Sequence, residues 1–222
     1  MTAVKKIRVM ESVRSRNDAA ARGFNEYLTA NRVCCVNMLG APGAGKTSLL
    51  IQLIKRLDKP SFVIEGDIAS DIDTRMLSKL GITAVQMNTG GACHLNAAAV
   101  ADIYKRHASG FADGYLFIEN IGNLICPADF SLGEHASMLV VSVTDGSDKP
   151  YKYPLAFEKT DAVLLNKIDL ADRVDFDRVF FMTGISLLNG GASVFDVSGK
   201  TGAGAEVVAQ WLSDRRSRLF HI

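Results

Sequence analysis

The sequence predicts an α/β protein built on a doubly wound, mostly parallel sheet. Short apolar runs alternate with stretches of helical periodicity, and the runs lie at residues 33–39, 62–65, 84–87, 115–119, 138–143, 162–165 and 194–197. Strands that alternate with helices favour a parallel sheet covered by helices on both faces. Polar or glycine-rich residues follow several of these runs. Because ligands bind at the carboxyl ends of the strands in such sheets, we expect the functional site at that edge.

The two ends of the chain predict helices. Apolar residues recur at helical spacing among many charges over residues 4–31, and a last helical pattern covers residues 204–219. A length of 222 residues, 48% of them hydrophobic, suits one domain with a full core. We therefore predict a single domain over residues 1–222, with residues 1–32 as a helical extension packed on it.

Composition argues against two classes of partner. The net charge is +1, and no basic run is interleaved with aromatic residues, so we expect no nucleic acid. No apolar stretch approaches the roughly 20 residues of a membrane span, and the N-terminus lacks the apolar run of a signal peptide. These features predict a cytoplasmic protein with no membrane partner, in a compartment where disulfides rarely persist.

A glycine-rich segment after the first strand matches the P-loop of nucleotide-binding proteins. Gly40-Ala-Pro-Gly-Ala-Gly-Lys46-Thr47 lies between an apolar run and a helical pattern, a context that disfavours a chance glycine turn. Its backbone N–H groups would surround a phosphate, Lys46 would bridge the β- and γ-phosphates, and the Thr47 hydroxyl would bind Mg²⁺. The predicted phosphate-binding residues are Gly43, Ala44, Gly45, Lys46, Thr47 and Ser48.

Acidic residues at strand ends could complete the magnesium site beside Thr47. Glu119 and Asp67 end two of the predicted strands, and Asp73 is a weaker candidate that follows Asp67. The alternative is that these carboxylates only cap the helices that follow. We predict that Lys46, Asp67 and Glu119 act in catalysis and that Thr47, Asp67 and Glu119 bind Mg²⁺.

A polar tetrad after the sixth run predicts that the base is guanine. In Asn166-Lys167-Ile168-Asp169, the carboxylate of Asp169 can accept hydrogen bonds from guanine N1–H and its amino group, whereas adenine offers no such pair of donors. Lys167 can cover the base with its methylene groups, and Asn166 can brace the loop. Three further residues, Ser198, Gly199 and Lys200, resemble the second guanine loop of GTPases.

Two cysteines and a histidine form a candidate metal site. Cys93, His94 and Cys126 lie on two loops after predicted strands and would suit Zn²⁺ or Ni²⁺. Three ligands leave the shell incomplete, so a two-fold dimer or water would have to complete it. The alternative is that the thiols are small buried hydrophobes. The other candidates carry no such pattern: we predict core positions for Cys34 and Cys35, which point to opposite faces of a strand, and surface positions for His107, His135 and His221.

These residues together resemble the nickel-incorporation GTPases of hydrogenase and urease maturation, the HypB family. The most specific segments are Cys93-His94-Leu95 and Glu119-Asn-Ile-Gly-Asn-Leu-Ile-Cys-Pro127, and the P-loop, Glu65-Gly-Asp67, Asn88-Thr-Gly, Ser142-Val-Thr, Asp148-Lys-Pro-Tyr-Lys-Tyr-Pro154 and Asn166-Lys-Ile-Asp169 also match. The resemblance implies a P-loop NTPase of the SIMIBI type that hydrolyses GTP with Mg²⁺. It also implies a GTP-dependent homodimer in which Cys93, His94 and Cys126 hold nickel or zinc at the interface. Lys152 would reach the neighbouring subunit's nucleotide.

The implied function is nickel insertion during [NiFe]-hydrogenase maturation, with a nickel-delivery accessory protein and the hydrogenase large subunit as partners. The chain departs from the family pattern at Asn96, where Asp is usual, and at Gly91-Ala92, where Lys-Gly is frequent. Those departures leave the choice of metal open. The alternatives are a urease-maturation nickel GTPase, although its usual Cys-Pro-His is Cys126-Pro127-Ala128 here, a nickel or zinc storage or sensor protein, and an ATP-dependent small-molecule kinase.

The segment from Glu119 to Cys126 suggests how the two sites communicate. One end would approach Mg²⁺ and the γ-phosphate, the other would hold a metal thiolate, and Gly122 would be the hinge. No Gln follows Gly122 and no arginine finger is evident, so we expect slow intrinsic hydrolysis.

Overall fold

The sheet of the protein is entirely parallel and contains the strands that the sequence predicts. The computed structural model describes residues 2–67, 72–91 and 94–222, with no side-chain description for residues 2–12, 67 and 72–73. The strands are β1 (Cys34–Gly40), β2 (Ser61–Asp67), β3 (Thr83–Asn88), β4 (Tyr115–Glu119), β5 (Ala136–Ser142), β6 (Ala162–Asn166) and β7 (Ser193–Asp196). They form one seven-stranded sheet in the order β3-β2-β4-β1-β5-β6-β7. The predicted doubly wound fold is therefore confirmed.

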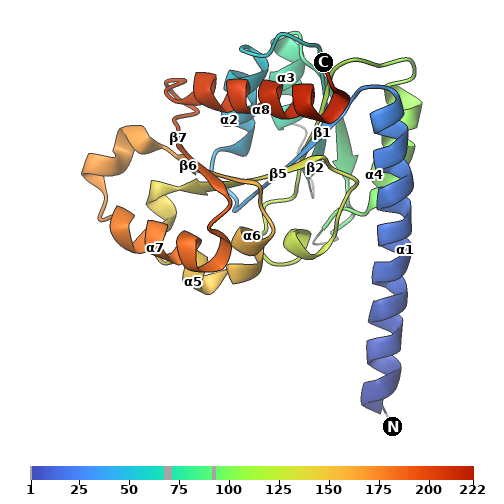
Figure 1. Cartoon of the computed structure of the whole chain (residues 1–222), viewed down its shortest axis with the longest axis horizontal. Helices are drawn as coiled ribbons and strands as arrows, with labels where there is room; N and C mark the ends of the chain where they lie inside the picture. Colours follow the sequence, from blue (N-terminus) through green and yellow to red (C-terminus); the bar gives the residue numbers. More distant parts are fainter. Residues whose placement is uncertain (1, 68–71, 92–93) are drawn as a thin grey trace.

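Helices cover both faces of the sheet (Figure 1). They are α1 (Thr2–Ala30), α2 (Lys46–Ile54), α3 (Ile72–Lys79), α4 (Ala97–His107), α5 (Lys149–Lys152), α6 (Pro154–Glu158), α7 (Arg178–Asn189) and α8 (Ala205–Phe220), with 3-10 turns η1 (Pro127–Asp129), η2 (Val143–Asp145) and η3 (Ile168–Arg173). One face packs on α2, α3 and α8. The other face carries α1 and α4 over one half and α6 and α7 over the other half.

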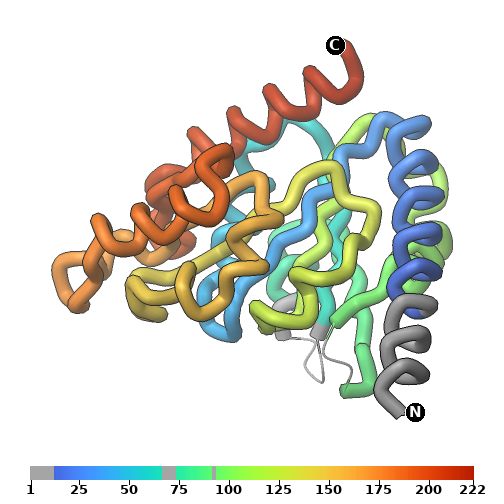
Figure 2. The backbone as a smooth tube through the Cα atoms, turned by 60° about the horizontal axis from the view of Figure 1, so that its bottom comes forward, coloured from blue at the N-terminus to red at the C-terminus, as the bar shows by residue number. Residues whose placement is uncertain are grey.

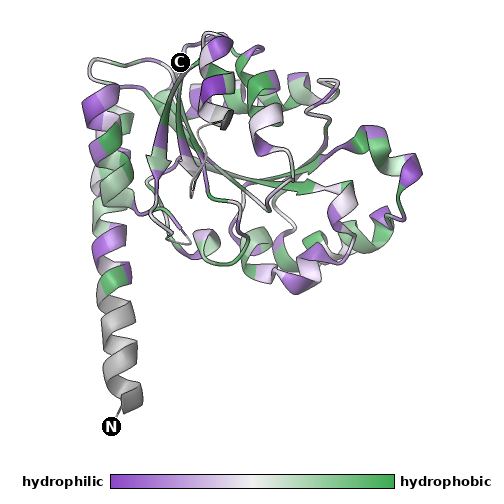
Figure 3. Ribbon diagram, turned by 180° about the vertical axis from the view of Figure 1, so that it is seen from behind, coloured by the Kyte–Doolittle hydropathy of each residue, from purple (hydrophilic) through white to green (hydrophobic). Residues whose placement is uncertain are grey.

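Alternation along β1 explains this layering. Cys34, Val36 and Met38 are buried in the cluster under α2 and α8, whereas Cys35 and Leu39 point to the opposite face. All of them are nearly inaccessible to solvent, as expected for the central strand of a sheet covered on both sides. Figure 3 shows hydrophobic colouring along the strands and hydrophilic residues on the outer helices.

Helix α1 lies beside α4 (Figure 2), and it extends beyond the body of the domain toward its N-terminus in Figure 1. Its C-terminal half is anchored by Phe24 and Leu28, which are buried in the cluster that also holds Tyr104 of α4. Asn25 Nδ2 donates to the carbonyl of Gly133 at 3.0 Å, which ties the helix to the loop before β5. Within the described part of the chain, no helix has the length and apolarity to cross a bilayer.

Candidate functional site

The loop between β1 and α2 has the backbone of a phosphate-binding loop. Gly43 and Gly45 have positive φ angles of 75° and 92°, which glycine adopts at little cost. Gly45 is also the N-cap of α2 and gives that helix no side-chain cap. Because Gly45 has no side chain to cap this helix, an anion could approach the first N–H groups of α2 and would be stabilised by them and by the helix dipole.

A cavity of about 490 Å³ opens in front of this loop. Its lining includes Gly43, Gly45, Lys46, Thr47, Glu65 and Glu119. The cavity therefore brings together the predicted phosphate-binding glycines, the predicted lysine and the predicted strand-end carboxylate.

Thr47 and Glu119 are directly joined at one wall of the cavity. The Thr47 hydroxyl donates to Glu119 Oε1 at 2.7 Å, and both residues are buried. Glu119 reaches this position because β4 lies next to β1, with Glu119 paired to Met38. A hydroxyl and a carboxylate in contact at the phosphate loop are the hard oxygen ligands that Mg²⁺ requires, so these residues fit that ion. Lys46 Nζ donates to the carbonyl of Gly40 at 3.3 Å and is also buried.

Glu65 is a site residue that the sequence reasoning missed. It lines the cavity with 3% of its surface exposed, and it lies beside Glu119 because these two residues are paired in register on β2 and β4. The hydroxyl of Thr74 on α3 donates to Glu65 Oε2. The sequence carries two signals for it, a carboxylate at the end of the apolar run 62–65 and the family-like segment Glu65-Gly-Asp67, but Asp67 is the residue that the sequence analysis selects from that segment.

The roles of Asp67 and Asp73 at the magnesium site remain predictions. Asp67 ends β2, where its backbone pairs with Asn88, and Asp73 lies in the first turn of α3. Their side chains lie outside what the structure describes.

Asn166 joins the phosphate loop to both loops of the predicted guanine site. Its Nδ2 donates to the carbonyl of Ala44 at 2.8 Å, and its Oδ1 accepts from the N–H of Gly199 at 2.9 Å. The side chain is buried, with 1% exposed. The close fit extends to Gly45, where a Cβ atom would lie 2.4 Å from Asn166 Nδ2. One amide thus fixes the relative positions of three loops that are distant in sequence.

Asp169 and Ser198 also meet at this edge. The buried Ser198 hydroxyl donates to Asp169 Oδ1 at 2.6 Å, while Asp169 itself is exposed. Lys167 adopts a left-handed conformation with φ 59°, and its Nζ lies 3.5 Å from Thr144 Oγ1. Lys200 is exposed on the neighbouring loop. The structure therefore places a carboxylate, oriented by a serine, at the edge that carries the phosphate loop.

The candidate metal ligands are only partly described. Cys126 is half-buried and is the N-cap of η1. The ring of His94 stacks on Phe130, which follows η1, with centroids 4.1 Å apart and planes 11° apart. This contact brings the loop of His94 onto the segment that begins at Cys126. Cys93 lies outside the described residues, and the described ones contain no group of three or more His, Cys, Asp and Glu side chains placed to hold a metal ion.

The segment that joins Glu119 to Cys126 packs against the phosphate loop. Gly40 and Asn123 form an antiparallel bridge. A Cβ atom on Gly122 would lie 2.9 Å from Cγ of Pro42, so glycine permits this close approach. A change in the phosphate loop would therefore reach this segment through direct contact.

The other residues that the sequence analysis singles out make contacts within the fold. Lys152 is exposed and pairs with Asp148 Oδ2 at 2.5 Å, and this carboxylate raises the pKa of Lys152. Cys34 and Cys35 lie in the core on opposite faces of the sheet, as predicted, and burial raises the pKa of Cys34 to about 11. Asn96 is the N-cap of α4, where its side chain accepts from the N–H of Ala99.

The predicted surface position is confirmed for His107 and His221 but is wrong for His135. His135 is half-buried, and both of its ring nitrogens form hydrogen bonds. Nδ1 accepts from the N–H of Cys35 at 2.9 Å, and Nε2 lies 2.9 Å from Thr29 Oγ1. Burial, aided by Arg215, lowers the pKa of His135 to about 4. Its position follows from packing between α1 and β1, which no local sequence pattern reveals.

Comparison with known proteins places this site in a family. The family model described as "CobW/HypB/UreG, nucleotide-binding domain" matches residues 34–195. The hydrogenase maturation factor HypB of Rhizobium leguminosarum bv. viciae is 40% identical over 218 residues, which cover 96% of this chain and 71% of that protein. The chain belongs to the HypB family. The hydrogenase/urease maturation factor HypB of Helicobacter pylori is 32% identical and is covered over 89% of its length, with 96% of this chain covered.

Solved HypB structures have the same fold. HypB of Helicobacter pylori, crystallised in complex with nickel, superposes with a TM-score of 0.87 at 31% identity, over 92% of this chain and 97% of that chain. HypB of Archaeoglobus fulgidus gives a TM-score of 0.81 at 35% identity, over 92% and 99% of the two chains. The signal recognition particle receptor FtsY of Elizabethkingia anophelis, at 17% identity and a TM-score of 0.54, shares the fold alone. These matches agree with a P-loop NTPase of the SIMIBI type.

Proposed function

We propose that this HypB family member is a GTP-hydrolysing nickel chaperone for [NiFe]-hydrogenase maturation. The observation that carries the proposal is the continuity of two candidate sites. Glu119 contacts Thr47 in the nucleotide cavity, and the segment that follows it packs on Pro42 and leads to Cys126. The nickel complex of the Helicobacter pylori relative supports nickel as the cargo.

The residues of the cavity have distinct roles in this proposal. The N–H groups of the phosphate loop and the ammonium of Lys46 bind the phosphates, while Thr47 and Glu119 hold Mg²⁺. When bound, that ion neutralises charge on the β- and γ-phosphates. Asp169, oriented by Ser198, accepts hydrogen bonds from guanine. Within the second guanine loop, the N–H groups of Ser198 and Gly199 are donated to Ala203 O and Asn166 Oδ1, so we assign the N–H that meets the base to Lys200.

Guanine selection is tested by replacing Asp169. Asp169→Ala removes a charged acceptor of two hydrogen bonds, so the Kd for GTP should rise about 10- to 100-fold while ATP remains a poor competitor. Asp172→Ala, on the same 3-10 turn, is the matched control and should bind GTP as the wild type does. Equal affinity for GTP in the two variants would remove Asp169 from the base site.

The link between nucleotide and metal is tested by light scattering combined with chromatography. Protein loaded with a non-hydrolysable GTP analogue should elute as a homodimer and bind Ni²⁺ more tightly than the GDP form, since one segment serves both sites. Cys126→Ala should lose tight nickel binding and keep its GTP affinity, whereas the core variant Cys34→Ala should keep both. Equal nickel affinity in the GTP-analogue and GDP forms would rule out the coupling. It would favour the storage or sensor alternative, in which nucleotide is incidental.

The candidate client proteins are a hydrogenase and a urease. The relatives are described as hydrogenase maturation factors, and those from Helicobacter as hydrogenase/urease maturation factors. We propose a hydrogenase client first, with the hydrogenase large subunit and a nickel-delivery accessory protein as partners, because relatives at 38–40% identity are described as hydrogenase maturation factors alone. A purified hydrogenase large subunit that gains nickel only with this protein and GTP would support that choice, and gain by a urease apoprotein alone would contradict it.

A further inference from the structure

The central strand of the sheet contains a buried amide. Asn37 lies in the middle of β1 with 1% of its surface exposed. Its neighbours on the same face, Cys35 and Leu39, belong to two separate apolar clusters, so Asn37 lies at the boundary between them. An aliphatic side chain at this position would avoid the cost of burying a polar group. The amide must therefore be satisfied by partners, and those partners show what it connects.

Asn37 is the middle of a chain of hydrogen bonds. Asn120 Nδ2 donates to Asn37 Oδ1 at 3.1 Å, and Asn37 Nδ2 donates to Glu134 Oε1 at 3.0 Å. At one end, Asn120 Oδ1 accepts from the N–H of Ile121 at 2.9 Å. At the other end, Glu134 Oε2 accepts from the N–H of Leu132 at 2.7 Å and from Ser131 Oγ at 3.0 Å. The chain thus runs between two backbone turns.

The chemistry of the two ends fixes the order of the groups. Both ends are backbone N–H donors. A side-chain amide that accepts a hydrogen bond with its oxygen presents its NH₂ group, again a donor, to the next member. A chain between two donors therefore needs one member that accepts on both sides, which is a carboxylate. Glu134 is that member. Replacing it by an amide must bring two N–H groups face to face somewhere along the chain, at the cost of unsatisfied buried donors.

One end of the chain holds the nucleotide site. Asn120 directly follows Glu119, lines the cavity in front of the phosphate loop and is buried. Its own N–H donates to the carbonyl of Met38 at 3.0 Å. The turn that presents Glu119 to Thr47 is therefore held by the side chain as well as the backbone of Asn120.

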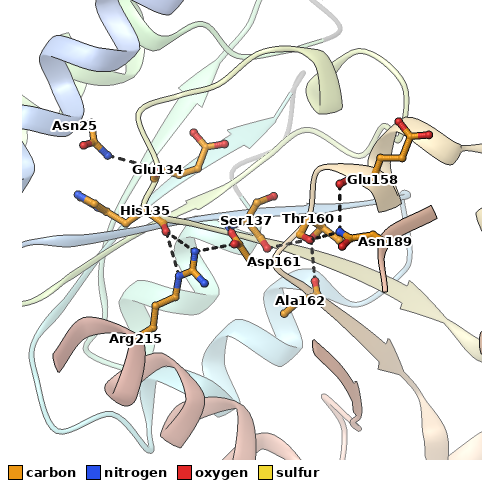
Figure 4. Close-up of polar contacts among 10 residues, drawn as sticks. All are labelled: Asn25, Glu134, His135, Ser137, Glu158, Thr160, Asp161, Ala162, Asn189 and Arg215. Atoms are coloured by element: carbon orange, nitrogen blue, oxygen red, sulfur yellow. Dashed lines mark hydrogen bonds and ion pairs between the residues drawn. The ribbon is translucent and has the colours of Figure 1, made fainter. Parts of the chain in front are cut away.

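The other end holds helix α1 and the start of α4. Carbonyls of the loop around Glu134 accept from α1: Asn17 Nδ2 donates to Ser131 O at 2.8 Å, and Asn25 Nδ2 lies 3.5 Å from Glu134 O (Figure 4). Asn17 Oδ1 in turn accepts from the N–H of Ala97, the first residue of α4, at 2.9 Å. His94 lies just before that helix.

We propose that Asn37 and Glu134 are positioning residues for the nucleotide site, which hold the turn after Glu119 in place and connect it to the docking of α1. The inference rests on the proposed GTPase function only for its effect on hydrolysis. The positioning of the turn is already present in the nucleotide-free protein and can be measured there. The two effects are therefore measured separately.

The test exchanges the carboxylate along the chain. Glu134→Gln brings two donors together, and Asn37→Asp brings two carboxylates together, so each single variant breaks the chain. The double variant Asn37→Asp with Glu134→Gln restores every bond: Asn120 Nδ2 donates to Asp, the amide of Gln donates to the same Asp, and the oxygen of Gln accepts from Leu132. The double variant also preserves the number of charges.

The first measurement is hydrogen exchange in nucleotide-free protein. The Ile121 and Leu132 amides should exchange at least about tenfold faster in each single variant and return to the wild-type rate in the double variant. Wild-type rates in the single variants, or faster rates in the double variant, would overturn the proposal. Asn189→Ala is the control, because Asn189 Nδ2 bridges the carbonyls of Phe157, Glu158 and Thr160 rather than a group of the hydrogen-bond chain. Figure 4 shows its bonds to Glu158 and Thr160, and this variant should leave both amides unchanged.

The second measurement is steady-state GTP hydrolysis. In the single variants kcat should fall about tenfold or more with a smaller change in KM, because a misplaced Glu119 turn affects geometry more than binding. The double variant should recover to within about threefold of the wild type, on the same reasoning. If the amides exchange faster but kcat stays at the wild-type value, the hydrogen-bond chain contributes only to stability, and the positioning role is overturned. A wild-type protein that does not bind GTP would instead refute the proposed function. The hydrogen-exchange result would still show whether the hydrogen-bond chain holds the turn after Glu119 in place.

Discussion

Asn166 shows how much one side chain can organise at the residue scale. It holds the phosphate loop through Ala44 and the second guanine loop through Gly199, and it does so from the end of β6. The sequence motif predicts an asparagine that braces its own loop. It does not predict which backbone groups are bound, because those depend on loops that are distant in the chain.

The first prediction concerns this brace. Asn166→Asp keeps the acceptor for the Gly199 N–H but places an anionic oxygen against the carbonyl of Ala44, which lies 2.8 Å from Asn166 Nδ2 in the wild type. The free energy of unfolding should fall by about 2–4 kcal/mol, since a buried charge would face an acceptor. Urea denaturation measures this value. Unchanged stability would mean that the amide does not hold the loops.

The second prediction concerns the pH dependence set by His135. Nδ1 accepts from Cys35, so the buried ring is neutral, and its pKa of about 4 lies below the 6.5 of a free histidine. Between these pH values the unfolded chain binds the proton more readily than the folded protein does. The contribution of the neutral His135 to the free energy of unfolding is therefore fully present above pH 6.5 and is lost as the pH falls toward 4. The loss should be about 2–3 kcal/mol.

Urea denaturation at pH 7 and pH 4.5 checks this effect. His135→Asn can still accept from Cys35 but does not titrate, so it should lose less stability than the wild type on acidification. His107→Asn, at an exposed histidine, should lose as much as the wild type. An equal loss in the two variants would contradict the assignment to His135.

At the scale of elements, α4 illustrates what a single cap can determine. The helix begins at Ala97 after Asn96, whose side chain accepts from Ala99 N–H at 2.9 Å. The family comparison in the sequence raised Asn96 as a departure that could affect the metal. The structure gives this residue a capping role that aspartate can also fill.

The third prediction follows from that cap. Asn96→Ala should lower the free energy of unfolding by about 1 kcal/mol, because the cap hydrogen bond is lost. Asn96→Asp should keep the wild-type stability or gain a few tenths of a kcal/mol, since a negative charge is favourable at a helix N-terminus. Thermal melts of the two variants decide between this role and a purely metal-related one. A stable alanine variant would exclude the cap.

The elements also show where sequence reasoning ends. The strands and long helices could be predicted, because buried strands are continuous apolar runs and long helices have a period. The turns η1 and η3 and the short helices α5 and α6 could not, since three to six residues carry too little periodicity. Glu65 was missed because its proximity to Glu119 depends on the register of β2 and β4, which the intervening α3, β3 and α4 separate in the chain.

At the scale of the molecule, the nucleotide site is assembled from loops that span the sheet. The phosphate loop follows β1, Glu119 ends β4, Asn166 ends β6, and Ser198 follows β7. The alternation of strands and helices predicts that such loops share one edge. The order of the strands is not readable from the sequence, because β1 pairs with β4 and β5 rather than with its neighbour in the chain. The metal site remains a prediction, since Cys93 lies outside the described residues.

The fourth prediction uses this assembly. A ligand that binds all of these loops stabilises the folded state as a whole, so a GTP analogue at a hundred times its Kd should raise the free energy of unfolding by about 2.7 kcal/mol. ATP at the same concentration should give little change, because Asp169 selects guanine. Thermal melts with Mg²⁺ and each nucleotide provide the measurement. Equal stabilisation by ATP would contradict a guanine site.

The placement of β1 in the middle of the sheet has a consequence for synthesis on the ribosome. Its two neighbours, β4 and β5, are translated long after it, and the loop of Ser198 follows the last strand. Parallel pairings of this kind are non-local and form slowly. A nascent chain therefore carries its phosphate loop early but cannot complete the nucleotide site until almost the whole polypeptide has emerged. Nucleotide capture would then distinguish finished molecules from interrupted ones, and until that point the apolar faces and the unpaired backbone edges of β1 remain exposed to chaperones.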